Sequence, residues 1–279
     1  MKKFLTIMIL LLLAGVTGCK EQPKDLDRVN HQIDAFIETY LVTYVNDDKQ
    51  DFYVTRAIAK LAEYGYDIDL ADYVTEDTIK TTYDAMEYES IATIFQALMI
   101  GQLYDYQPST ALLALDGFSS FETWNHVIGY LSLKMTNKNI TLQQSTRQQM
   151  LVRSENDYRD ADFAGLALMA TADETIDRTL FLGLISDAVD EDGIKSGWGG
   201  ANSCSTSMAI LGYLAIRENP RTVLTVDLIS ALLEFFEEGA ARYELGEEVD
   251  LLFSTPQAFS ALVAYKIYAE KSIYVNLFN

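Results

Sequence analysis

The sequence of 279 residues has few cysteines, histidines, tryptophans and prolines, and these shortages exclude several classes of protein. Its two cysteines rule out a cysteine-rich metal site. The two histidines, His31 and His126, leave few ways to build a zinc site, which needs three or four converging N, S or O ligands. Only four prolines occur, and sustained alternation of apolar and polar residues is missing, so strand signals are weak throughout.

Positive charge is also scarce. The chain has 21 basic and 41 acidic residues, a formal net charge of −20. A domain this acidic repels phosphate backbones, so we expect no nucleic-acid partner, and we interpret the acidity first as a solubility feature. Hydrophobic residues make up 49% of the chain, which supplies a sizeable core and excludes global disorder.

A long apolar run occurs only at the beginning of the chain. Two lysines precede the apolar residues 4–14, and the stretch Val-Thr-Gly-Cys at 16–19 follows. The run is too short to span a membrane, which takes ~20 apolar residues, and its layout is that of an export signal. The segment resembles a bacterial lipoprotein signal whose lipobox is residues 16–19.

The resemblance implies that residues 1–18 are removed and that the thiol of Cys19 carries a diacylglycerol. Residues 19–26 would then form a lipidated tether, because they are polar, contain a proline and have no apolar period. We therefore expect an extracytoplasmic protein anchored to the bacterial membrane, with Cys204 as a thiol that has no partner for an intrachain disulfide. The alternative is an ordinary secretory signal with an incidental cysteine.

The rest of the chain has a helical pattern, and we predict one all-α domain over residues 27–279. Apolar residues recur at three- and four-residue steps, for example in 29–40, 176–185 and 226–236. Six apolar helical stretches each contain a small residue, and successive small residues lie about 40 positions apart, the length of a pair of helices. These small residues are Ala59, Ala97, Gly129, Ala167, Ala209 and Ala261.

Six helical hairpins can stack as an open array or close on themselves. In either case the apolar helix of each pair would lie inside while its partner shows a polar face to water. An open array usually needs polar caps at both ends, whereas the last repeat, residues 255–268, is as apolar as the middle ones. The pattern therefore predicts an (α/α)6 toroid with inner and outer helices. The alternative is a chance spacing among ordinary amphipathic helices.

Three stretches in the second half place a polar capping residue just before an apolar run. Asp160 opens one run, the residues 202–206 (NSCST) open the next, and the residues 254–257 (STPQ) open the last. Such side chains accept hydrogen bonds from the free N–H groups of a first helical turn. The glycine-rich loop that begins at Asp192 lacks the lysine and the spacing of a phosphate-binding loop.

Together these stretches resemble the prenyltransferase and terpenoid-cyclase superfamily of α/α toroids, and above all the non-catalytic repeats of bacterial surface proteins and cobalamin carriers. Those repeats have a DG-rich loop, then an N-S-x-S-T helix start, then a T-x-Q-A start on the last helix. The resemblance covers residues 157–279, and it reaches residues 50–135 only through the repeat spacing.

The catalytic motifs of toroid proteins are not intact in this sequence. Prenyltransferases bind zinc through Asp, Cys and His, but Asn202 stands near Cys204 where an acid is needed, and both histidines lie well upstream. Terpene cyclases use a DxDD motif, of which Asp160 and Asp162 are present while Phe163 replaces the last acid. The Cys-Gly-Glu-Gln stretch of thioester domains and the G-x-S-x-G motif are missing. We therefore expect no cofactor and no metal.

The leading hypothesis is a lipid-anchored cell-surface protein whose toroid binds an unknown small molecule, lipid, glycan or surface protein without converting it. One alternative is an extracytoplasmic enzyme that acts on an isoprenoid or glycan, since a carboxylate pair in the centre remains open. Another is a structural or adhesive protein whose centre is plugged by Phe95, Met99 and Met169. The candidate binding residues, each of which could instead be a cap or a turn residue, are Asp160, Asp192, Trp198, Asn202, Ser203, Thr206 and Gln257.

Overall fold

The computed structural model describes residues 24–46, 49–152 and 160–279. The predicted signal, the lipidation site Cys19 and the tether up to residue 23 lie outside the described residues. Within them the chain is mostly helical, as the sequence predicts, with thirteen α-helices and only short strands. None of these helices has both the length and the apolar character needed to cross a membrane.

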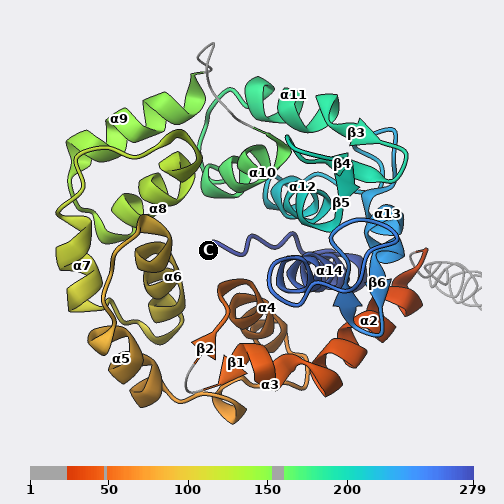
Figure 1. The fold of residues 1–279 in the computed structure, drawn as a ribbon, viewed down its shortest axis with the longest axis horizontal. Coiled ribbons are helices and arrows are strands. Elements are labelled where there is room, and N and C mark those ends of the chain that lie inside the picture. The colour runs from red at the N-terminus through yellow and green to blue at the C-terminus, as the bar shows by residue number, and fades with distance from the viewer. Residues whose placement is uncertain (1–23, 47–48, 153–159) are drawn as a thin grey trace, which may run out of the picture.

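The α-helices are of two kinds that alternate along the chain (Figure 1). Figure 1 shows one set, which we call the core helices, around the C mark and the other set, the covering helices, outside it. The core helices are α4 (Phe52–Glu63), α6 (Ile91–Gly101), α8 (His126–Thr136), α10 (Ala161–Ala170), α12 (Ser203–Ala215) and α14 (Ser254–Lys271). The covering helices are α2 (Leu26–Thr39), α3 (Leu41–Tyr44), α5 (Glu76–Ala85), α7 (Ser109–Leu115), α9 (Ile140–Leu151), α11 (Thr179–Asp187) and α13 (Leu228–Glu234).

Each of the six small residues predicted to mark a repeat lies in one of the six core helices. These helices pack in succession from α4 to α14, and α14 packs in turn against α4. The tightest approach joins α10 and α12, where a Cβ on Gly165 would come within 2.3 Å of the carbonyl oxygen of Met208. Only glycine allows the two backbones to lie this close.

Short antiparallel hairpins lead into three of the core helices. Strands β1 (Val45–Asn46) and β2 (Lys49–Gln50) precede α4, and β6 (Phe236–Glu237) and β7 (Ala240–Ala241) precede α14. Before α12, β3 (Val189–Asp190) pairs with β4 (Gly193–Lys195), which pairs with β5 (Ala201–Asn202). The remaining short elements are the 3-10 helices η1 (Leu70–Asp72), η2 (Gln102–Tyr104) and η3 (Thr123–Asn125). The strands are too short for the alternation of residues that would have predicted them.

A threonine in the first turn of the core helix holds each of two hairpins in place. In α12, Thr206 Oγ1 accepts a hydrogen bond from Ile194 N (3.0 Å) and donates to Asn202 O (2.7 Å). In α14, Thr255 Oγ1 accepts from Ala241 N (2.9 Å) and donates to the backbone oxygen of residue 250 (2.7 Å). The same device therefore occurs twice, which supports the interpretation of these segments as repeats.

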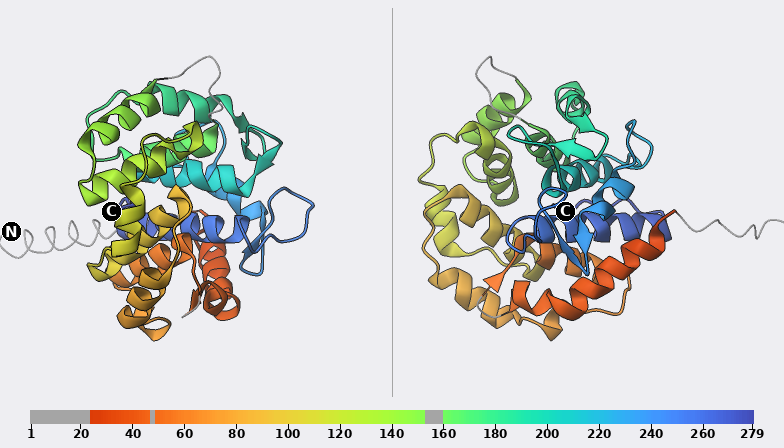
Figure 2. Two further views of the ribbon diagram at one scale, coloured as in Figure 1. Left: turned by 60° about the vertical axis from the view of Figure 1, so that its left-hand side comes forward. Right: turned by 45° about the vertical axis from the view of Figure 1, so that its right-hand side comes forward.

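The core helices define two opposite faces of the molecule. We call the end where α4, α10, α12 and α14 begin, together with the hairpins and loops that lead into them, the start face. The opposite end, at which the core helices terminate, we call the finish face. In the left view of Figure 2 the loop between β7 and α14 projects to the right from the start face, on the far side of the molecule from the C mark.

The finish face is closed by residues 272–279, which reach the middle of the core helices in Figure 1. The guanidinium of Arg56, on α4, is 2% exposed and donates from Nε to Leu277 O (2.7 Å) and from Nη2 to Asn279 O (3.0 Å). The ring of Phe278 lies 5.6 Å from that of Phe95 on α6. Nothing in the sequence predicted this segment, because its hydrogen bonds with Arg56 join residues that are more than 200 positions apart.

Helix α2 begins at Leu26, the last residue assigned to the predicted tether. Asp25 accepts a hydrogen bond from the Ser230 hydroxyl (2.9 Å) and pairs with Arg221 (3.5 Å). The segment just before α2 is therefore attached to the rest of the fold at the first described residues. Because Arg221 lies in the loop after α12, this attachment is at the finish face.

Candidate functional site

Two of the predicted site residues are helix caps at the start face. Asp160 Oδ1 accepts a hydrogen bond from Phe163 N (3.1 Å), and Asn202 Oδ1 accepts from Ser205 N (2.8 Å). Each acceptor satisfies a free N–H group in the first turn of its helix. The sequence thus located the starts of α10 and α12 to the residue.

The predicted residues Ser203, Thr206 and Gln257 lie inside or against the core. Ser203 and Thr206 are fully buried, and the Thr206 hydroxyl is used by the hairpin lock. Gln257 is partly buried in the first turn of α14. The structure therefore brings these three residues to the same end of the molecule, but it leaves the Thr206 hydroxyl engaged within the fold.

Asp192 and Trp198 lie at the surface of the start face. Asp192 is exposed in the turn between β3 and β4, and the side chain of Trp198 is 78% exposed on a glycine-rich loop. The backbone of that loop is held by Trp198 N, which donates to Ser196 Oγ (3.2 Å). Trp198 is thus the predicted residue best placed to meet a partner.

The loop between β7 and α14 carries exposed apolar residues that the sequence analysis missed. Leu252 and Phe253 are 69% and 67% exposed. This loop contacts the glycine-rich loop, because Gly200 N donates to Glu244 Oε1 (3.3 Å). We call Trp198, Leu252 and Phe253 the start-face patch. Apolar side chains gathered at the surface mark interaction sites more often than isolated ones do.

Asp250 fixes the backbone beneath this patch. Burial alone would raise the pKa of Asp250, but hydrogen bonds from Ser254, Leu252 and Phe253 outweigh it and lower the pKa below its ordinary value. The carboxylate therefore does the work of an N-terminal cap for α14, which the sequence analysis had assigned to the stretch 254–257. Its position four residues before the helix explains why it was missed.

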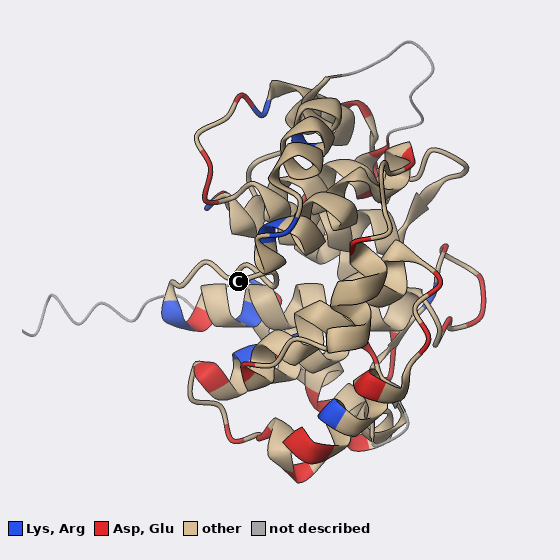
Figure 3. Cartoon of the chain, turned by 90° about the vertical axis from the view of Figure 1, so that its left-hand side faces the viewer, with Lys and Arg blue, Asp and Glu red and all other residues tan. Residues whose placement is uncertain are grey.

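The turns and loops that carry or adjoin the patch are rich in carboxylates. In Figure 3 the Asp and Glu residues (red) crowd the loops at the right-hand edge of the molecule. Lys195 and Arg242, in or next to the same hairpins, are already paired with Asp190 and Glu237. The local charge is therefore negative. The carboxylates on the turns and loops next to the patch are Glu191, Asp192, Glu244, Glu247 and Glu248.

A group of buried polar side chains lies at the starts of α10 and α12. Asp162 Oδ1, Ser203 Oγ and Ser205 Oγ are buried, and the Ser205 hydroxyl lies close enough to the Asp162 carboxyl to favour its charged form. Burial raises the pKa of Asp162 to about 6, an effect that Ser205 opposes and Asp160 reinforces. The sequence had marked Asp162 only as part of an incomplete DxDD motif.

Cys204 is a buried thiol next to this group. Its Sγ donates to Ser254 Oγ (3.6 Å), and burial raises its pKa to about 12. A thiol with so high a pKa is not a thiolate nucleophile at neutral pH. Both histidines, His31 and His126, lie well upstream of Cys204 in the sequence. No group of three or more His, Cys, Asp or Glu side chains that could hold a metal ion occurs in the described ranges.

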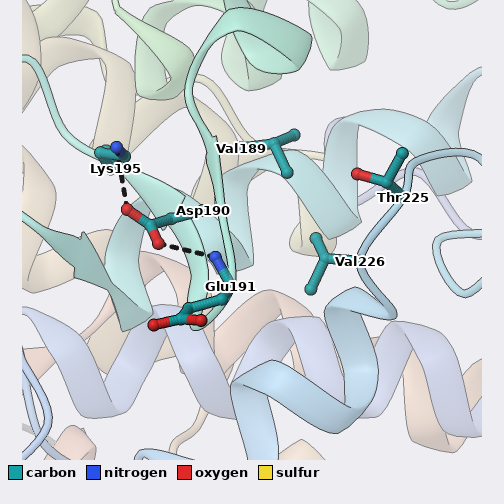
Figure 4. Close-up of a pocket in the computed structure, with 6 residues that line it drawn as sticks. All are labelled: Val189, Asp190, Glu191, Lys195, Thr225 and Val226. Carbon is teal, nitrogen blue, oxygen red and sulfur yellow. Dashed lines mark hydrogen bonds and ion pairs between the residues drawn. The ribbon is translucent and has the colours of Figure 1, made fainter.

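Two cavities lie elsewhere on the surface. Figure 4 shows a hollow of about 500 Å³ between the β3–β4 hairpin and residues Thr225 and Val226, in which Asp190 pairs with Lys195 (2.8 Å). The second, of about 390 Å³, lies at the finish face. Its lining residues are Lys60, Glu63, Tyr64, Ala172, Asp173, Ala215, Arg217, Tyr274, Asn276 and Asn279.

Comparison with known proteins adds no relative to this description. The chain matches no protein-family model, no curated protein and no solved structure.

Proposed function

We propose that this chain is a lipid-anchored, extracytoplasmic binding protein and that its helices form an (α/α)6 toroid. The packing of α14 against α4 supports closure, since an open array would leave its first and last core helices apart. The alternation of core and covering helices and the six small residues at matched positions support the pairing into hairpins.

The partner is a macromolecule that docks on the start-face patch. The observation that carries this proposal is the exposure of Trp198, Leu252 and Phe253 on two touching loops. Large aromatic side chains supply much of the binding energy at protein interfaces. The proposal commits to a surface protein with Lys or Arg around an apolar centre, because the turns and loops that carry or adjoin the patch are rich in carboxylates and opposite charges favour association.

A small ligand in the centre of the core helices is a weaker proposal. Phe95, Met99 and Met169 are buried, and Phe278 packs against Phe95 from residues 272–279. Buried side chains at these positions leave less room for a ligand among the core helices. The same filling favours a structural or adhesive role as the second candidate function, which the experiment below separates from partner binding.

The anchor and the patch would lie at opposite faces. Residues 24 and 25 are held at the finish face by hydrogen bonds with Arg221 and Ser230. A lipid on Cys19 would therefore hold the finish face toward the membrane and turn the start face outward, where a partner protein can reach it. Cys19→Ala should abolish incorporation of labelled palmitate, and unchanged incorporation would overturn the anchoring.

Cross-linking on intact cells tests the patch. The variant carries Trp198→Ala, Leu252→Ser and Phe253→Ser, and the matched control carries Trp124→Ala, Leu113→Ser and Ile140→Ser, three residues that are equally exposed on other elements. We expect a discrete cross-linked species that the patch variant loses and the control keeps. A species that survives in the patch variant, or no species with the unaltered protein, would contradict partner binding and favour the structural role.

A further inference from the structure

The finish-face cavity contains an arginine in a backbone conformation that arginine rarely adopts. Helix α12 ends at Ala215, and Arg217 follows with φ +67°, in the left-handed region. Arg217 N donates to Leu214 O (3.1 Å), and Glu218 N donates to Tyr213 O (2.9 Å). Glycine is the usual residue at this position of a helix end, because it adopts positive φ without steric cost. Seven non-glycine residues of the described chain have positive φ, and Arg217 is the one among them that lines this cavity. A strained residue at a cavity is a candidate for a functional side chain.

The guanidinium of Arg217 is exposed and makes no ion pair or hydrogen bond with the rest of the described chain. The other charged residues that line the cavity have ion-pair partners. Glu63 pairs within the cavity with Lys60 (2.6 Å), and Asp173 pairs with Lys134 (3.0 Å). Arg217 is therefore the charged lining residue that has no ion-pair partner in the described chain.

The helices α4, α10 and α12 all end at this cavity, and the last carbonyls of a helix carry partial negative charge that opposes a bound anion. Arg178 offsets this effect at the end of α10. Its Nη2 donates to Thr171 O (2.5 Å) and Glu174 O (2.8 Å), where α10 ends next to the cavity residues 172 and 173. At the finish face the guanidinium groups of Arg56 and Arg178 therefore donate to backbone oxygens, whereas that of Arg217 is available to a ligand.

The size and the other lining groups suit a small polar molecule. The volume of about 390 Å³ lies within the usual range for ligand sites, which is roughly 300–1,000 Å³. Tyr64 and Tyr274 supply aromatic surface, and the ring of Tyr274 is held 4.7 Å from that of Tyr268. A guanidinium binds phosphate and carboxylate oxygens in pairs, and it prefers such planar recognition to a single contact.

We propose that the finish-face cavity binds a phosphate ester, with the phosphate on Arg217 and the body of the ligand beside Tyr64 and Tyr274. The phosphate belongs to a soluble ester or to a lipid headgroup, because the same face holds residues 24 and 25, from which the predicted anchor would lead to the membrane. This site lies at the opposite face from the start-face patch and does not depend on it.

The test uses Arg217→Gly, which removes the charge and at the same time relieves the backbone strain. The probes are glycerol 3-phosphate, inorganic phosphate, and vesicles of phosphatidylglycerol or phosphatidylcholine. We expect the unaltered protein to bind glycerol 3-phosphate saturably, and Arg217→Gly to bind it at least tenfold more weakly while melting at the same or a higher temperature without ligand. Arg217→Lys should retain part of the affinity.

Arg242→Ala, which removes a paired arginine at the other face, is the control for the loss of one positive charge. Equal binding by Arg217→Gly, equal weakening by Arg242→Ala, or no saturable binding of any phosphate probe would overturn the proposal. Equal affinity for succinate would overturn the assignment to phosphate. Binding to phosphatidylglycerol vesicles that Arg217→Gly loses would identify a lipid headgroup as the source, and binding to the soluble ester alone would identify a free phosphate ester.

Discussion

The caps and hairpin locks at the start face join residues close together in the sequence, whereas the hydrogen bonds of Arg56 at the finish face join the two ends of the chain. Asp160 caps α10 by bonding a residue three positions ahead, and Thr206 holds Ile194 twelve positions behind it. Arg56, in contrast, bonds Leu277, 221 positions away. The comparison teaches that the caps of the core helices are encoded locally, whereas the hydrogen bonds of Arg56 form only when the whole chain is folded.

The largest expected effect is that of Arg56→Ala. The substitution removes the buried guanidinium and leaves the backbone oxygens of Leu277, Asn279 and Met99 without their donors. We expect a loss of about 3–5 kcal/mol in the free energy of unfolding, as for other broken buried charge networks. Chemical denaturation measures the loss, and limited proteolysis should show early cleavage within 272–279. A loss below about 1 kcal/mol would remove the contrast between the faces.

A smaller effect is expected at the start face for Thr206→Val. The valine keeps the shape but leaves the buried N–H of Ile194 without its acceptor. The expected cost is about 1–3 kcal/mol. Thr255→Val should cost a similar amount, because Thr255 accepts from Ala241 N in the same way. If either variant destabilised the protein as much as Arg56→Ala, local encoding of the start face would be refuted.

The smallest effect is expected for Asp162→Asn, and it should depend on pH. Folding raises the pKa of this carboxyl from 3.8 to about 6, so the native state favours the protonated form. The stability of the unaltered protein should therefore fall as pH rises from about 4 through about 6. The amide variant lacks this penalty and should be more stable by on the order of 1–2 kcal/mol at pH 8.

Denaturation curves at pH 8 and pH 4 measure this difference, which should shrink toward zero at the lower pH. Asp160→Asn, which keeps the cap acceptor at the same helix start, is the matched control. An Asp162→Asn variant whose advantage grows at low pH would show that the carboxylate is stabilised by its surroundings.

The sequence predicted the start face far better than the finish face, for a physical reason. A cap residue must stand within a few positions of the helix that it caps, so Asp160 and Asn202 mark their helices in the sequence itself. The six small residues also repeat at a readable interval, and each proved to lie in a core helix. The closed (α/α)6 toroid that the six small residues predict is part of our proposal.

The parts of the structure that were missed have no local signature. Arg56 lies within an apolar helical stretch, and nothing near it in the sequence shows that its partners are at residues 277 and 279. The exposure of Leu252 and Phe253 was missed for another reason. Apolar residues next to a helix start are usually taken for core, and Asp250, which fixes the loop beneath them, stands outside the expected cap position.

The packing of residues 254–279 against the first helices has a consequence for biosynthesis. The ring of Phe36 on α2 stacks on that of Phe259 on α14, with 3.9 Å between the ring centroids. Arg56 likewise gains its acceptors only from Leu277 and Asn279, near the end of the sequence. While the chain is being made, α2 and α4 cannot cover their apolar faces until these late residues have emerged. Contacts of such high sequence separation form slowly, so a nascent chain stays open over most of its synthesis. If the chain is exported as we propose, it would cross the membrane in this open form and complete its fold on the far side.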